Sequence, residues 1–151
     1  MSILIGGIPA HPLIVHAAVI LVPIAALVAA WAATKPSWHR NHAWLTSILG
    51  VGTAAIVVIS NNTGEGLMVA KGATEANPGI YGDHAMKAKF VLIAATVVAI
   101  SVVVKHLALK FPQVPVIAVT AARVLAIVAA VVAVISVILT GHAGAALVWD
   151  N

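Results

Sequence analysis

Seven histidines stand out in a chain that otherwise carries few groups able to do chemistry. The 151-residue sequence has no cysteine and only four acidic residues, and 62% of it is hydrophobic. Without cysteine there is no disulfide, no thiolate-bound iron–sulfur cluster and no covalently attached c-type haem. A neutral imidazole, by contrast, ligates haem iron, zinc or copper and relays protons. The groups available for chemistry are therefore the imidazoles, with the carboxylate of Glu65 as a further possible ligand.

The elements that must position these histidines are membrane helices. Mean hydropathy is +1.12 and only 8% of residues are charged, too few to cover a water-soluble domain of this size. Four apolar runs reach the roughly 20 residues that cross about 30 Å of hydrocarbon. In lipid the backbone must satisfy its own hydrogen bonds, so these runs are expected to be helices despite their Val and Ile content. The sequence predicts an all-α fold, a single four-helix transmembrane domain of up-down topology, with spans over 12–33, 43–60, 85–110 and 116–140.

The connections between the spans indicate an orientation. Short polar turns are expected at 34–42 and 111–115, whereas the glycine-rich connection 61–84 is long enough to be functional and predicts a short interfacial helix. The N-terminus lacks a positively charged segment, so the first span is expected to be retained. One side carries Lys35, Arg40, Lys105, Lys110 and Arg123; the other carries all four acids with Lys71, Lys87 and Lys89. The positive-inside rule then places both termini and the long connection outside.

Because successive spans run in alternating directions, the histidines fall into two groups at opposite ends of the bundle. His11 and His16 lie at the start of the first span, His84 at the start of the third and His142 just after the fourth, so these four share one end with Glu65. The other end has His39, His42 and His106, close in sequence to Trp38 and Trp44 or to basic residues. For that second group, anchoring at the membrane interface is the expected role.

Within the first group, His11 and His16 are predicted to differ in role. Five residues separate them, about 140° around a helix, so they cannot both point inward. His11 precedes a proline and is biased away from helical geometry, so it is expected to cap or line the mouth of the site. His16 lies about 6 Å deeper and is expected to face inward. The structural alternatives are a carbonyl-bonded His16, a solvated His84 and a His142 that merely ends a helix.

Three kinds of site would use converging imidazoles. Two histidines on different helices would bind haem b axially; histidines with Glu65 would bind zinc or copper; His16 with Glu65 would relay protons or ions. A cofactor-free subunit is the remaining alternative. The sequence has no phosphate-binding loop, dinucleotide fingerprint, HExxH motif or credible Ser–His–acid set, and no basic run with interleaved aromatics. Hydrolysis and nucleic-acid binding are therefore not expected.

Four stretches resemble a bacterial membrane-protein family, the domain of unknown function numbered 2231. They are "IPAHPLIVHAAVILVPIAAL", "NNTGEGLMVAK", "YGDHAMKAK" and "LTGHAGAALVW", and together they span nearly the whole chain. The motif residues are His11, Pro12, His16, Thr63, Gly64, Glu65, His84, Gly141, His142 and Gly144. This chain is poorer in acids around Glu65 than is common in the family, and it ends soon after the last motif.

The resemblance implies a four-helix membrane domain, in some members fused to or encoded near Rieske or cytochrome c modules. With no fused module expected here, an electron partner would be a separate protein or quinol. The resulting hypothesis is a b-type haem near the outer face of the bacterial cytoplasmic membrane, with His16 as one axial ligand and His84 or His142 as the other. His11 and Glu65 would support the ligands or the propionates. An electron carrier or accessory subunit in the lipid bilayer is favoured over a stand-alone enzyme, as a homo-oligomer or within a larger complex.

Overall fold

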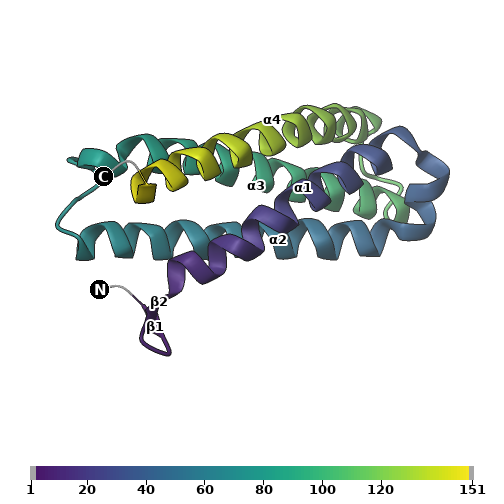
Figure 1. Cartoon of the computed structure of the whole chain (residues 1–151). Helices are drawn as coiled ribbons and strands as arrows, with labels where there is room; N and C mark the ends of the chain where they lie inside the picture. Colours follow the sequence, from purple (N-terminus) through teal and green to yellow (C-terminus); the bar gives the residue numbers. More distant parts are fainter. Residues whose placement is uncertain (1–2, 150–151) are drawn as a thin grey trace.

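The computed structural model describes residues 3–149 and contains four long helices that run up and down (Figure 1). Each is long and apolar enough to cross a membrane, which confirms the expected four-helix transmembrane bundle. Both ends of the described chain lie at the same end of the bundle as the α2–α3 connection (Figure 1). We call this the His84 end and the opposite one the Lys105 end. The helices are α1 Ala10–Thr34, α2 Pro36–Ala70, α3 Gly82–Lys110 and α4 Val116–Trp149.

The helices pack in a ring through small side chains. Each contacts its neighbour in sequence, and α4 closes the ring against α1. Lipid tails are as apolar as leucine, so the helices gain little by hiding large aliphatic groups and instead pack where small residues let backbones approach. On α4 the buried positions are Ala122, Ala126, Ala129, Ala130, Ala133, Ser136 and Ala143. The large Val, Ile and Leu side chains of the same helix are mostly exposed, as expected for a lipid-facing surface.

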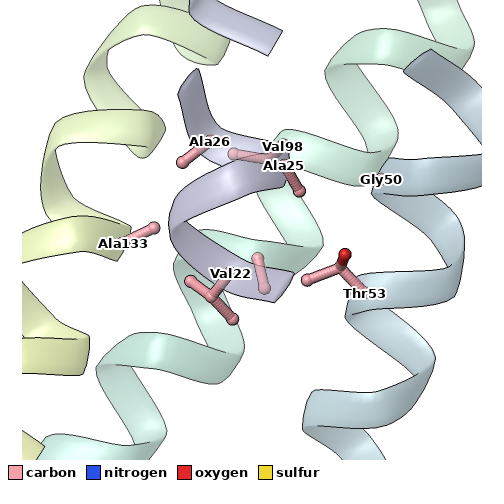
Figure 2. A pocket seen from close by; sticks show the side chains of 8 residues that line it. Val22, Ala25, Ala26, Gly50, Thr53, Val98 and Ala133 are labelled. Carbon is pink, nitrogen blue, oxygen red and sulfur yellow. The ribbon is translucent and has the colours of Figure 1, made fainter. Parts of the chain in front are cut away.

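The centre of the bundle is nearly solid. It encloses a cavity of about 10 Å³ on which side chains from all four helices converge (Figure 2). Thr53 of α2 lines this cavity, and its buried hydroxyl has no hydrogen-bond partner among the described groups. The neighbouring Gly50 lets α3 approach closely, because a Cβ there would stand 2.8 Å from a methyl carbon of Val102.

Helix α2 is longer than the sequence predicted. The expected turn 34–42 is almost entirely helical: only Lys35 separates α1 from α2, and Pro36 occupies the first turn of α2, where its missing N–H costs nothing. The predicted start at Ala43 coincides with a kink at His42, whose φ of −124° and ψ of 17° are not helical.

The far ends of α2 and α4 also exceed the predicted spans. Residues 61–70 continue α2 without a break, so the expected separate interfacial helix is part of it, and α4 continues from 140 to Trp149. Hydropathy detects only the apolar part of a helix, whereas residues 61–66 of α2 are polar or glycine and the extension of α4 begins with Gly141 and His142. A short 3₁₀ turn, η1 (Gly79–Tyr81), leads into α3.

A two-stranded hairpin precedes α1, and the sequence did not predict it. Strand β1 (Leu4–Ile5) pairs antiparallel with β2 (Ile8–Pro9), with Ile5 opposite Ile8. The two-residue turn between them is Gly6–Gly7, with φ of +58° and +81°. Positive φ at both central residues suits a tight hairpin and is adopted readily by glycine.

Candidate functional site

His11 of α1 and His84 of α3 lie against each other at the His84 end. Their ring centroids are 6.3 Å apart and the ring planes are nearly perpendicular, at 85°. The Nδ1 of His11 lies 3.0 Å from the carbonyl of Ser60, and the Nδ1 of His84 lies 3.1 Å from the carbonyl of Thr140. A carbonyl only accepts, so each Nδ1 carries the proton and donates. In the neutral ring this leaves Nε2 with its lone pair, the form in which histidine ligates a metal.

Two glycines make room for these rings. A Cβ built at Gly64 of α2 would stand 2.8 Å from Cε1 of His11, and one at Gly144 of α4 would stand 3.1 Å from Cε1 of His84. A side chain at Gly64 would therefore require the His11 ring to shift, and one at Gly144 would press tightly against the His84 ring. The group that lies against each of these two glycines is a histidine ring.

The expected roles of His11 and His16 are the wrong way round. His11 belongs to α1 itself, which begins at Ala10, and its ring is half-buried between helices. The first turn of a helix tolerates Pro12, so His11 need not leave helical geometry. His16 is exposed, and its Nδ1 contacts the carbonyl of Pro12 one turn earlier on the same helix. It therefore faces away from the bundle.

His84 and His142 share an open pocket of about 510 Å³ between the start of α3 and the end of α4. Ile80, Ala146 and Leu147 supply apolar lining, and Asp83 and Lys87 form an ion pair on it. His142 is exposed on α4, so its ring remains accessible from this pocket. The volume is in the range of small-molecule and cofactor sites, about 300–1,000 Å³.

Glu65 lies at the same end but is engaged within α2. Its Oε1 accepts a hydrogen bond of 2.6 Å from Nδ2 of Asn61, four residues earlier. In residues 3–149 no group of three or more histidine, cysteine or acidic side chains is arranged to hold a metal ion. The sequence-predicted set is therefore divided: His11 pairs with His84, His84 shares a pocket with His142, and Glu65 and His16 each bond within their own helix.

The Lys105 end holds buried polar groups, among them His39, for which anchoring at the membrane interface was expected. His39 is only 4% exposed, and although the Lys105 backbone lies near its ring, neither ring nitrogen makes a hydrogen bond of normal geometry. Lys105 is equally buried and donates from Nζ to the carbonyl of Ala32 at 2.7 Å. His42 stacks on Trp38, and His106 bonds to the Ser47 hydroxyl. Anchoring was therefore the wrong expectation for His39.

A family model described as "Predicted membrane protein (DUF2231)" matches residues 7–151. The match covers nearly the whole chain, so the protein belongs to this family. No curated protein and no solved structure matches it.

Proposed function

We propose that this DUF2231 membrane protein binds one haem b at the pocket shared by His84 and His142 and takes part in electron transfer. The observation that carries the proposal is the position of two histidines from different helices on one pocket of about 510 Å³. His84 is held by its bond to the Thr140 carbonyl, which directs its lone pair to Nε2. His142 would supply the second axial nitrogen, and His11 would stay behind His84 as a packing partner.

The number of donors favours haem over a bare metal ion. Zinc sites use three or four protein ligands. In haem the porphyrin supplies four nitrogen ligands to the iron, so the protein needs to supply only one or two. Residues 3–149 offer pairs of imidazoles but no arranged group of three. Two histidines are thus enough for haem and too few for a tetrahedral zinc or copper site.

The rest of the pocket suits an amphipathic disc. Ile80, Ala146 and Leu147 would contact the apolar faces of the ring, and the Lys87 ammonium would pair with a propionate. Haem, when bound, supplies one-electron redox chemistry; the chain would hold it and exclude water from one side. A continuous proton or ion path is less well supported, because the central cavity of about 10 Å³ has room for at most one water molecule.

The proposed setting is the bacterial cytoplasmic membrane, with the His84 end outside. Lys35, Arg40, Lys105, Lys110 and Arg123 all belong to the Lys105 end, which the positive-inside rule assigns to the cytoplasm. A haem at the His84 end would then exchange electrons with quinol or with a separate redox protein outside.

Absorption spectroscopy of protein purified after haem-replete expression tests the proposal. We expect a Soret band in the wild type with about one haem per chain, lost in His84→Ala and strongly reduced in His142→Ala. His142 is exposed, so its removal should leave the fold intact. His16→Ala is the matched control and should keep the full band, because His16 faces away from the pocket. A wild type without haem, or with stoichiometric zinc or copper by elemental analysis, would reject the proposal.

A further inference from the structure

The Lys105 end contains a cluster of nitrogen-bearing side chains from three helices, in which Lys105 and Arg123 are the cations. Lys105 and His106 come from α3, His39 from α2 and Arg123 from α4, and these groups are close enough to interact electrostatically. We call this set the cationic cluster. Two of its members, His39 and Lys105, are 4% exposed, while Arg123 reaches the outer surface.

Lys105 has a structural reason to be there. In a regular helix the carbonyl of Ala32 would accept from the N–H of residue 36, but residue 36 is a proline and has no N–H. The ammonium of Lys105 takes that place at 2.7 Å, and a cation is favourable at the C-terminal end of a helix. This accounts for one of its three N–H groups and leaves its charge without a carboxylate.

Within residues 3–149 the chain provides no counter-charge at this end. Among residues 3–149 the acids are Glu65, Glu75 and Asp83, all near the His84 end, and the two ion pairs formed there involve Lys87 and Lys89. Charges removed from water are ordinarily paired, because an isolated buried charge costs several kcal/mol. A buried lysine, a buried histidine with unbonded nitrogens and a nearby arginine therefore point to an anion from outside the chain.

The position of Arg123 identifies the kind of anion. It is exposed on α4, about 10 Å along the helix axis from Val116, and therefore close to the membrane boundary. Trp31 and Trp44, both more than half exposed, lie near this end as interfacial tryptophans do. We propose that the cationic cluster binds the phosphate of an anionic phospholipid, with Arg123 in contact and the Lys105 ammonium adding positive potential from behind. This site is distinct from the His84 pocket and does not depend on haem.

Thermal unfolding of the purified full chain in neutral detergent tests this proposal. Phosphatidylglycerol should raise Tm of the wild type by several degrees, whereas equal amounts of phosphatidylcholine should not. Arg123→Gln should weaken the phosphatidylglycerol effect about fivefold in apparent affinity, as expected for loss of one near-surface charge. Lys110→Gln, at the same end but outside the cluster, is the control and should keep the wild-type response.

Two outcomes would overturn the assignment. An equal Tm increase with phosphatidylcholine, or an unchanged response in Arg123→Gln, would remove the cationic cluster as an anionic-lipid site. If inorganic phosphate alone reproduced the full increase, the ligand would be a free anion and the lipid assignment would be wrong. Arg123 is exposed, so its substitution should not prevent folding, unlike that of the buried Lys105.

Discussion

Two glycines tie the histidine pair to the packing of the bundle. A methyl group at Gly64 would collide with the His11 ring and one at Gly144 would contact the His84 ring tightly, and both rings are further held by bonds to backbone carbonyls. His11 and His84 are thus fixed by packing as well as by hydrogen bonds. A ring fixed in this way is pre-organised for ligation, since its orientation need not be ordered when a ligand binds.

Gly64→Ala is expected to destabilise the protein by about 1–3 kcal/mol, as overpacking does, and Gly144→Ala, where the contact is looser, by less. The Cβ added at Gly64 would displace His11 from its carbonyl partner. Gly52→Ala and Gly141→Ala are matched controls on the same two helices, because a Cβ there meets nothing within 4 Å. Thermal unfolding in detergent measures the difference. Equal Tm values for Gly64→Ala and Gly52→Ala would contradict the tight contact at His11.

Lys105→Met is expected to lower stability by about 1–3 kcal/mol, because the buried Ala32 carbonyl would lose its donor and Pro36 cannot replace it. Lys110→Met, at the exposed C-terminal residue of the same helix, should change little. The free energy of unfolding in denaturant, compared between the two variants, checks this expectation. A Lys105→Met protein as stable as the wild type would show that the bond to Ala32 contributes nothing net.

At the scale of the helices, a seven-residue spacing determines which residues face inward. The series are 11, 18, 25 and 32 in α1; 39, 46, 53 and 60 in α2; 84, 91, 98 and 105 in α3; and 122, 129, 136 and 143 in α4. Every residue in these series is buried except His11 and His84, which are half-buried. A seven-residue period is typical of helices that pack with a slight left-handed supercoil. His16 and His142 fall outside the series, and both are exposed.

This spacing was the signal that sequence reasoning missed. Hydrophobicity does not show which face of each helix points into the bundle. Apolar residues occur on every face, and they are as favourable against lipid as they are against another helix. Small and hydroxyl residues carry the rotational information instead, since they mark where backbones approach. The seven-residue series of Ala32, Ala25 and Ala18 continues to position 11, so it predicts that His11, and not His16, faces inward. The same spacing, followed from Thr46, Thr53 and Ser60, predicts a buried His39.

Ala133→Leu tests the importance of small residues at the helix interfaces. Ala133 is 1% exposed and lines the central cavity, which is far too small for three more carbons, so overpacking should cost about 1–3 kcal/mol. Val132→Leu, one residue away and 40% exposed, adds a methylene toward lipid and should be neutral. Thermal unfolding of both variants decides the matter: similar Tm values would mean that the bundle repacks freely.

For the molecule as a whole, the sequence predicted the number of helices, their order and the side on which each histidine lies. These depend on the length of each apolar segment and on the alternating direction of successive helices, and both can be read from the sequence. It did not predict the ends of α2 and α4, where polar residues and glycines interrupt the apolar runs, or the N-terminal hairpin, whose turn depends on two glycines. Nor did it predict which side chains meet, because that requires helix rotation.

The orientation is still a prediction, and the absence of native cysteine makes it easy to test. Ala76→Cys lies in the exposed α2–α3 connection and Gln113→Cys in the exposed α3–α4 connection, at opposite ends of the bundle. In intact cells an impermeant maleimide should label Ala76→Cys, whereas Gln113→Cys should react only after lysis. The cysteine-free parent is the background control. The reverse labelling pattern would invert the orientation, and labelling of both in intact cells would contradict the up-down topology.

The N-terminal hairpin forms an exposed apolar element beside the bundle. It projects beside the start of α1 (Figure 1), and Ile3, Leu4, Ile5 and Ile8 are each more than half exposed. Such side chains gain free energy by entering the acyl boundary of a bilayer. The 25 residues of α1 measure about 37 Å, roughly 7 Å more than the hydrocarbon thickness, and an over-long helix tilts. Apolar contact of this hairpin with the bilayer surface would therefore favour one direction of tilt for α1, together with the packing of α1 against its neighbours.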